Sequence, residues 1–340
     1  MKNILLIRRD NIGDMVCTTP LIEGIKRTWP DVKLTVLVNK VAQDVALNNP
    51  YIDELYVYKK SKHREKGESA LKVYLQRLKI FFALRKTTFD MTILANPVPC
   101  KYSLRLATMA GAKKIIGAGT NPAELTIPLA KEDFNGAHQV EHTFTYLTKL
   151  APSAVAIPEV NVYLSPQEKG EAEKRLADKI PQDARVYGIH ISSRSVKRRW
   201  PVESYAQIIE KILQDPKAHV LLFWSPQGAL DPNDVGDSAR MQSLLQQVNS
   251  PRAIAYPTSS IRELIAGLDR CEQVLCSDGG QMHITAALHK KQVVFFGDTN
   301  AAAWHPWSGQ YAILQSASGD CADISVDEAW AAWQKLQAAS

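Results

Sequence analysis

One segment near the carboxyl end of the chain limits the fold more than any other. Two short apolar runs, Gln273–Cys276 and Val293–Gly297, enclose the glycine turn Ser277–His283 and the helical stretch Ile284–Leu288. A strand, a turn, a short helix and a second strand in this order predict a βαβ unit, whose two strands are parallel. Because parallel sheets need helices over both faces, the segment indicates an α/β protein.

Strand-like and helix-like stretches alternate along the rest of the chain. In the first half we expect strands at Asn3–Arg8, Lys33–Val38, Glu54–Tyr58, Met91–Ala95 and Lys114–Gly117. In the second half we expect strands at Arg185–Ile191, Val220–Trp224, Ala253–Tyr256, Gln273–Cys276 and Gln292–Phe296. Helical stretches separate these strands, so each half predicts a parallel, doubly wound sheet.

The length of 340 residues exceeds what a single hydrophobic core usually holds. A proline-marked, weakly patterned stretch at 151–159 is typical of a linker between domains. We therefore predict two Rossmann-like domains, residues 1–155 and 156–325, facing across a cleft. Residues 326–340 are expected to form an amphipathic C-terminal helix.

Composition excludes several classes of protein. Hydrophobic residues make up 45% of the chain and charged residues 22%, which is typical of a folded globular protein. No apolar run approaches the roughly 20 residues that span a bilayer, and the first residues lack a signal-peptide pattern, so we expect a cytoplasmic protein. Five cysteines without a C-x-x-C pair predict neither a disulfide framework nor a zinc site.

Basic residues gather in the range Lys59–Lys86, where few acidic residues oppose them. The later part of this range spaces its apolar residues as an amphipathic helix does. One interpretation is a solvated basic helix that packs on its own domain. The other is a surface for an anionic membrane or a phosphorylated acceptor, for which Arg64 and Lys66 are candidate contacts. No nucleic-acid-binding motif accompanies the charge, so nucleic acid is not an expected partner.

Ligands of open α/β sheets bind where loops leave the carboxyl ends of the strands. The first such loop, Arg9–Asp14, carries two carboxylates, Asp10 and Asp14, directly after the first strand. Two roles fit Asp14, which precedes a helical stretch. It is either a capping residue favoured by the helix dipole or a general base.

Two further loops belong to the second domain. Ser192–Pro201 combines hydroxyl groups, three consecutive cations and Trp200, a set that suits a diphosphate. The alternative is a solvated basic turn in which Trp200 anchors the packing. Asp278–His283 places Gly279 and Gly280 before a helix, so its backbone N–H groups can bind phosphate. The alternative here is an ordinary tight turn capped by Asp278.

Motifs of several common enzyme classes are missing from the sequence. The first βα turn has no G-x-G-x-x-G, and the chain has no G-x-x-x-x-G-K-[ST] and no G-x-S-x-G. These gaps argue against standard dinucleotide, P-loop and α/β-hydrolase sites. The eight histidines lack metal-ligand spacing, so no metal held by the protein is expected.

With these motifs in view, the chain resembles the ADP-heptose:lipopolysaccharide heptosyltransferases, glycosyltransferase family 9, which have the GT-B fold. The resemblance is carried by motifs spread over nearly the whole chain: Ile4–Asp14 with Thr18–Leu21, His190–Ser193, Lys197–Pro201, Ser277–His283 and Phe296–Thr299. It implies that the first domain binds the acceptor, the second binds an ADP-sugar, and the C-terminal helix packs back on the first domain.

The resemblance also implies roles for single residues. Asp14 would be the catalytic base of an inverting heptosyl transfer from ADP-L-glycero-D-manno-heptose to the inner core of a lipopolysaccharide. The nucleotide sugar would be bound by Ser192, Ser193, Lys197, Arg198, Asp278, Gly279, Gly280, Gln281, Met282 and His283. Asp10 and Asn11 join Arg64 and Lys66 as candidate acceptor contacts. No cofactor or metal is implied, and the enzyme would act on a lipid A–core acceptor at the inner leaflet of the cytoplasmic membrane.

Two departures from the family pattern leave alternatives open. Family members commonly carry lysine two residues before the tryptophan, where this chain has Arg198 with Lys197 beside it. Ser225–Gly228 also stands where an acidic residue is often found, which leaves the donor sugar open. The competing hypotheses are a GT-B transferase or epimerase that uses another nucleotide sugar, and a non-catalytic nucleotide-binding scaffold at the membrane.

Overall fold

The computed structural model describes the chain except for residues 59–69, 122, 154, 227–236 and 340. The chain divides into two compact units, Met1–Tyr163 and Leu164–Ser340. Among the described residues, no helix is long and apolar enough to cross a membrane.

The first unit is built on a six-stranded sheet in the order β3-β2-β1-β4-β5-β6. Its strands are β1 (Asn3–Arg8), β2 (Lys33–Asn39), β3 (Glu54–Tyr58), β4 (Met91–Leu94), β5 (Ile115–Ala118) and β6 (Ile127–Leu129). Every pair of neighbouring strands is parallel. This order is that of the Rossmann fold, in which the chain reverses direction across the sheet between β1 and β4.

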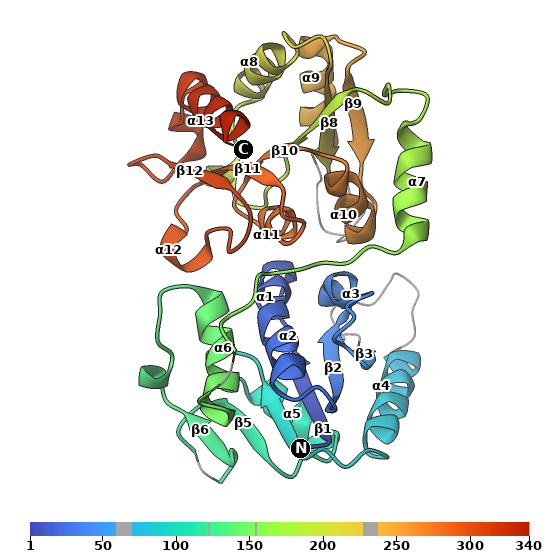
Figure 1. The fold of residues 1–340 in the computed structure, drawn as a ribbon, viewed down its shortest axis with the longest axis vertical. Coiled ribbons are helices and arrows are strands. Elements are labelled where there is room, and N and C mark those ends of the chain that lie inside the picture. The colour runs from blue at the N-terminus through green and yellow to red at the C-terminus, as the bar shows by residue number, and fades with distance from the viewer. Residues whose placement is uncertain (59–69, 122, 154, 227–236, 340) are drawn as a thin grey trace. The chain divides into compact units, whose positions relative to one another are not determined.

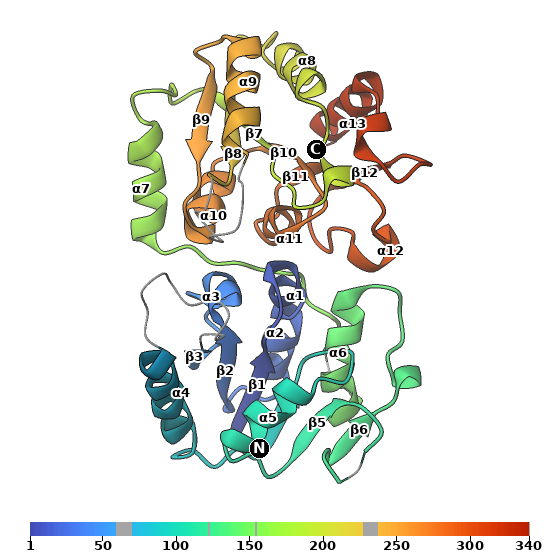
Figure 2. The same cartoon turned by 180° about the vertical axis from the view of Figure 1, so that it is seen from behind.

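Helices cover both faces of this sheet (Figures 1 and 2). They are α1 (Ile12–Val16), α2 (Thr19–Thr28), α3 (Lys40–Ala46), α4 (Ala70–Leu84), α5 (Lys101–Met109) and α6 (Gln139–Leu150). Helices α2 and α6 contact each other, and α4 and α5 pack Phe81, Leu84 and Ala107 into a core with Leu5 of β1. The apolar positions of these helices therefore bury the central strands from both sides.

The second unit repeats the same topology in the order β12-β11-β10-β7-β8-β9. Its strands are β7 (Arg185–His190), β8 (Ala218–Trp224), β9 (Ala253–Pro257), β10 (Gln273–Ser277), β11 (Lys291–Phe296) and β12 (Tyr311–Gln315). All neighbouring strands are again parallel. The reversal of strand order in this sheet falls between β7 and β10. Two Rossmann-like units confirm the predicted α/β fold class.

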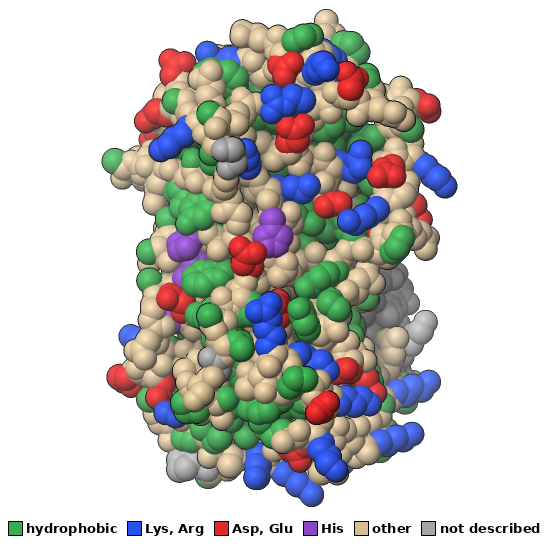
Figure 3. Space-filling view, in the orientation of Figure 1, with side chains coloured by type: hydrophobic (Ala, Val, Ile, Leu, Met, Phe, Trp, Pro, Cys, Tyr) green, Lys and Arg blue, Asp and Glu red, His purple; other side chains and the backbone are tan. Residues whose placement is uncertain are grey.

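The helices of the second unit are α7 (Pro166–Leu176), α8 (Val202–Ile212), α9 (Ser238–Val248), α10 (Ile261–Asp269), α11 (Gly280–Ala287), α12 (Ala301–Trp304) and α13 (Val326–Ala338). A 3₁₀ turn occupies Val196–Arg198. On the face shown in Figure 3, basic and acidic side chains are mixed over the surface of this unit.

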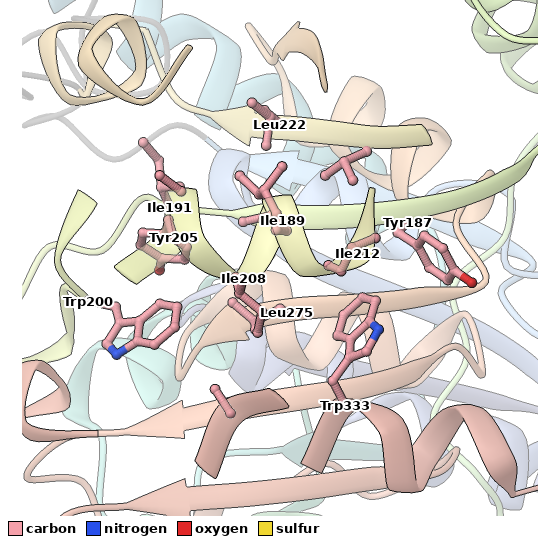
Figure 4. Close-up of a cluster of buried hydrophobic side chains, with 14 of the residues drawn as sticks. Tyr187, Ile189, Ile191, Trp200, Tyr205, Ile208, Ile212, Leu222, Leu275 and Trp333 are labelled. Carbon is pink, nitrogen blue, oxygen red and sulfur yellow. The ribbon is translucent and has the colours of Figure 1, made fainter. Parts of the chain in front are cut away.

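The C-terminal helix α13 belongs to the core of the second unit. It contacts α8, β11 and β12, and Trp333 is fully buried within the same cluster as Trp200 (Figure 4). The Trp333 ring meets the edge of the Tyr187 ring with 5.3 Å between centroids. The apolar face of α13 is therefore used within its own unit, and the expectation that this helix packs back on the first domain stays a prediction.

Candidate functional site

In the first unit, the loop after β1 is organised around a buried guanidinium. The Arg8 side chain is only 1% exposed, and its Nη2 donates a hydrogen bond of 2.8 Å to Asp14 Oδ1. Its Nη1 donates to the carbonyl oxygen of Ala95, and its Nε lies 3.5 Å from Asp10 Oδ2. One buried cation thus joins both carboxylates of the loop to the end of the neighbouring strand β4.

Asp14 is the third residue of α1 and caps that helix. Its Oδ2 accepts a 3.0 Å hydrogen bond from the backbone N–H of Asn11, the residue before the helix. The capping role weighed from the sequence is therefore real. The Asp14 side chain is still 19% exposed, so a carboxylate held by Arg8 and Asn11 also reaches solvent at the strand-order reversal.

Two asparagines that the sequence analysis did not single out hold this loop in place. Asn39 Nδ2 donates to the carbonyl oxygens of Arg9 and Asp10, the latter at 2.8 Å. Asn96 Nδ2 donates to the Asp10 carboxylate, and its Oδ1 accepts a 2.8 Å hydrogen bond from the Ser103 hydroxyl. Asn39 is the last residue of β2 and Asn96 lies two residues after β4, and this place at the ends of the strands adjacent to β1 is the signal from which they could have been found.

The candidate acceptor contacts are placed only in part. Asp10 and Asn11 lie in the loop between β1 and α1, just before Asp14, and Asn11 is exposed. Arg64 and Lys66 lie outside the described residues. The apolar half of the basic segment does form a helix, α4, as its spacing predicted.

In the second unit, the loop after β7 is braced by buried groups. Trp200 is fully buried and donates from Nε1 to the carbonyl oxygen of Ile324 at 2.8 Å. Arg240 of α9 donates to the carbonyl oxygens of Ile191 and Trp200 at 3.1 and 2.9 Å. Trp200 is therefore the packing anchor considered above, and Arg240 is a supporting residue that sequence reasoning missed.

The serines of this loop are half-buried and take part in its internal hydrogen bonds. Ser192 Oγ accepts a 3.2 Å hydrogen bond from the backbone N–H of Ser225, which follows β8. The Ser193 carbonyl oxygen accepts a 2.8 Å bond from Arg199 Nε. The Ser192 hydroxyl therefore keeps its own proton available for donation to a ligand.

The two candidate cations of the loop have different surroundings. Lys197 is exposed, whereas Arg198 turns toward the loop after β10, with its Nη1 3.2 Å from Asp278 Oδ2. Gly297, which follows β11, lies under both residues. A Cβ atom at this glycine would come within 3.0 Å of the Lys197 carbonyl oxygen and 3.1 Å of Arg198 Cγ. The close approach of Gly297 therefore fixes the position of the 3₁₀ turn Val196–Arg198, which is called the cationic turn below.

Asp278 is buried at the end of β10. Burial raises the pKa of its carboxyl group, and Asp298 acts in the same direction, while Thr299 and Arg198 oppose the shift. A buried acid beside Arg198 is poorly suited to contact phosphate, since like charges repel. The geometry instead makes Asp278 the partner that orients the guanidinium of Arg198.

Helix α11 begins directly after Gly279 with no side-chain cap. The first N–H groups of a helix have no intrahelical acceptor, so the backbone of Gly280, Gln281 and Met282 offers donors at the positive end of the helix dipole. The side chain of Gln281 turns back and donates to the Ser277 carbonyl oxygen at 2.8 Å. Met282 and His283 are buried, so this loop offers a ligand its backbone rather than these side chains.

His190 ends strand β7 beside this loop. Burial lowers the pKa of its imidazole to about 4, so the ring is neutral at pH 7.

The described residues contain no group of three or more histidine, cysteine or carboxylate side chains that could hold a metal ion.

Comparison with known proteins identifies the family to which the chain is similar. The family model for glycosyltransferase family 9 (heptosyltransferase) matches residues 77–330. Lipopolysaccharide heptosyltransferase 3 of Escherichia coli is 23% identical over 91% of this chain and 86% of its own length. Lipooligosaccharide heptosyltransferase 2 of Haemophilus influenzae is 22% identical over 94% of this chain and 90% of its own length.

Solved structures show the same fold. A glycosyltransferase family 9 protein of Veillonella parvula superposes with a TM-score of 0.85 at 18% identity, covering 100% of this chain and 98% of that one. The E. coli ADP-heptose lipopolysaccharide heptosyltransferase II gives 0.77 at 19% identity, with 99% and 98% covered. The two Rossmann-like units thus form a GT-B fold. Because the family model covers most of the sequence, this chain belongs to glycosyltransferase family 9, the heptosyltransferase family, and is a glycosyltransferase.

Proposed function

We propose that the protein transfers a heptose from ADP-L-glycero-D-manno-heptose to a hydroxyl of a lipopolysaccharide inner core, with inversion at the anomeric carbon. One observation carries the proposal. The uncapped N-terminus of α11 and the cation Arg198 are joined through Asp278 at the strand-order reversal of the second unit. Backbone donors and a guanidinium in this position suit the diphosphate of a nucleotide sugar.

The names of related proteins support the choice of donor. One E. coli family member is described as a heptosyltransferase with ADP, and another structure of it as a complex with ADP-2-deoxy-2-fluoro heptose. Both superpose on this chain over 98% of its length. We assign the same donor class to this chain because its loops after β7 and β10 carry hydroxyl groups, cations and an uncapped helix N-terminus, which suit a diphosphate.

The chemical step assigns one role to each unit. The Asp14 carboxylate removes the proton of the acceptor hydroxyl, whose oxygen forms a bond to the anomeric carbon. The bond from that carbon to the ADP oxygen breaks on the opposite side, and ADP leaves with the bonding electron pair. N–H groups of α11 with Arg198 and Lys197 stabilise the charge that develops on the diphosphate. This scheme uses protein groups alone and assigns no role to a metal ion or a cofactor.

A lipid-linked acceptor requires the enzyme to work at a membrane surface, and helix α4 supports peripheral association. Tyr74, Leu75 and Phe82 on this helix are 57%, 49% and 65% exposed. The exposed Lys79 lies among them, and Lys86 follows the helix. Exposed large apolar side chains beside cations are typical of helices that lie on an anionic membrane surface. We therefore propose that α4 docks on the inner leaflet of the cytoplasmic membrane.

Product analysis tests the function directly. The protein is incubated with ADP-heptose and a set of truncated lipopolysaccharide cores, and the products are identified by mass spectrometry. A mass gain of one heptose on one of the cores, with release of ADP, is expected. Transfer only from UDP- or GDP-sugars would indicate another transferase, and an altered nucleotide sugar without acceptor would indicate an epimerase. Nucleotide binding without turnover on any core would favour a scaffold.

A further inference from the structure

Arg9, the residue directly after β1, has surroundings that the proposed chemistry does not use. Its backbone carbonyl oxygen accepts a hydrogen bond from Asn39, which fixes the residue at the end of the strand. Its side chain is half-buried. Arg9 therefore stands at the strand-order reversal of the first unit, in the loop that leads into α1 and Asp14.

The side chains of Tyr58, Cys100 and Tyr102 surround the Arg9 guanidinium. Its Nε donates a 3.1 Å hydrogen bond to the hydroxyl of Tyr58, at the end of β3. Its Nη1 lies 3.5 Å from the sulfur of Cys100, the residue that precedes α5. The Tyr102 ring lies beneath it, with 5.0 Å between the ring centroid and Cζ. Groups from two parts of the fold, the end of β3 and the start of α5, thus hold the guanidinium in one orientation.

The neighbouring residue Arg8 is paired with carboxylates, whereas Arg9 has no such pairing among the described residues. Arg8 has two carboxylates within 4 Å, Asp10 and Asp14, whereas no described acidic residue lies within that distance of Arg9. A guanidinium has five N–H donors, and the bonds to Tyr58 and Cys100 use two of them. Partly buried arginines are normally paired with an anion, because removing the charge from water is costly.

We propose that Arg9 binds an oxyanion of the acceptor, a carboxylate or a phosphate next to the sugar that carries the reacting hydroxyl. This inference rests on the proposed function, because it takes the first unit as the acceptor-binding one. Both oxyanions accept paired hydrogen bonds from the planar guanidinium fork, which a lysine cannot reproduce. An anion held at Arg9 would place the acceptor in the loop that also carries the base.

Acceptors that differ in a single charge test this role. Arg9→Met and Arg9→Lys are compared with the unmodified enzyme on matched core oligosaccharides with and without the anionic group. For Arg9→Met we expect the KM of the anionic acceptor to rise about 10- to 100-fold, the range for loss of a charged hydrogen bond. The kcat value, the KM of ADP-heptose and the KM of the neutral acceptor should change little. Arg105→Met, at an exposed position of α5, is the matched control.

Two acceptor series separate the possible anions. Removing the phosphate from one core and replacing the carboxylate by its amide in another shows which group loses its dependence on Arg9. Calorimetric titration of each core into the unmodified protein and Arg9→Met measures the same difference without turnover. Equal acceptor affinities for the two proteins, with transfer intact, would overturn the role of Arg9 and leave the proposed function standing. Absence of both transfer and core binding in the unmodified protein would refute both.

Discussion

The Nη1 atom of Arg198 lies 3.2 Å from Oδ2 of Asp278, and this ion pair joins the loops that follow β7 and β10. The carboxylate is buried, whereas the Arg198 side chain is 31% exposed. The ion pair therefore holds the Arg198 guanidinium in a fixed position and leaves it accessible to solvent. It also explains why an acidic residue stands in a loop that is proposed to bind diphosphate: Asp278 positions Arg198, and the backbone of α11 supplies the other donors.

Replacing Asp278 by asparagine should separate stability from ligand binding. Because burial raises the pKa of Asp278 above its ordinary value of 3.8, this carboxyl group favours the folded state most below pH 3.8. That contribution is lost as the pH rises through the raised pKa. We expect Asp278→Asn to unfold at a higher urea concentration than the unmodified protein at pH 7, and the difference to shrink toward pH 3.8.

The same variant should bind ADP more weakly, because Arg198 loses the partner that orients it. Calorimetric titration with ADP at pH 7 measures this loss, and Arg198→Ala provides the comparison. A variant less stable at pH 7 than the unmodified protein would mean that attraction to Arg198 outweighs the cost of burying the Asp278 charge.

A methyl group at Gly297 should displace the cationic turn Val196–Arg198, because it would lie too close to the backbone of that turn. The Cβ of Gly297→Ala would lie 3.0 Å from the Lys197 carbonyl oxygen and 3.2 Å from that of Gly319, and backbone atoms give way less easily than side chains. We expect ADP affinity to fall about tenfold, equivalent to about 1.4 kcal/mol. Gly170→Ala is the matched control, because a Cβ on this α7 residue meets nothing within 4 Å. Unchanged ADP affinity in Gly297→Ala would show that the turn adapts.

Most of the fold could be predicted from the sequence, because each buried parallel strand forms an apolar run between turn residues. Strand β12, Tyr311–Gln315, was not predicted, since it lies at the sheet edge and has little buried surface to mark it. The sequence pattern favours a helical stretch from about Met15 to Arg27, in which Thr19 can cap a helix that has Pro20 at its first position, so the turn before Thr19 is expected to be irregular. The structure contains two helices, divided around Thr18, because Pro20 is accommodated in the first turn of α2.

The sequence predicts the loops of the candidate site, because each loop is one continuous segment. It does not predict the contacts between the loops. Asp14, Arg198 and Asp278 each lie in a segment that connects a strand to the next helix or in the first turn of that helix, and the sequence pattern located these segments. The pairing of Arg198 with Asp278 joins loops 80 residues apart in the chain, so no local pattern reveals it. The same holds for Arg8, which looks like an ordinary strand end until its contact with the carbonyl oxygen of Ala95 is seen.

Glu168 should make the second unit sensitive to acid. Its carboxylate receives two 2.6 Å hydrogen bonds from Arg262 of α10, and these lower the Glu168 pKa from 4.5 to about 2. The stabilisation is present above pH 4.5 and is lost as the pH falls through about 2. Glu168→Gln should reduce the free energy of unfolding at pH 7 by about 1–3 kcal/mol. The difference from the unmodified protein should close between pH 4.5 and 2 in urea titrations.

Glu173, which lies on α7 together with Glu168, is the matched control for this experiment. Its ion pair with Arg270 spans 3.0 Å, but both side chains are exposed. Exposed pairs contribute little, so Glu173→Gln should change the free energy of unfolding by less than about 1 kcal/mol. If the two variants were equally destabilised, the partly buried, two-bond geometry of the Glu168–Arg262 pair would not be the reason for its effect.

Removing the exposed apolar side chains of α4 should weaken membrane binding. Leu75→Ser combined with Phe82→Ser takes away two side chains that would enter the lipid interface, each worth about 1.5–3 kcal/mol when fully buried. We expect at least a tenfold lower partition onto vesicles that contain anionic lipid, measured by co-sedimentation. Binding should also fall with added salt, since cations flank these residues. Tyr311→Ser, an exposed aromatic of the second unit, is the control, and an equal loss there would contradict a specific role for α4.

Asp14→Asn should abolish most of the heptosyl transfer while leaving ADP binding unchanged. The amide keeps an oxygen that can accept the N–H of Asn11, so α1 retains its cap, but it cannot take a proton from the acceptor hydroxyl. Loss of a general base typically lowers the rate about 10²- to 10⁴-fold, so kcat should fall by that amount. Asp31→Asn, at an exposed position before β2, should leave kcat unaltered. Full turnover by a folded Asp14→Asn protein would leave Asp14 with its capping role alone and require the base to be sought elsewhere.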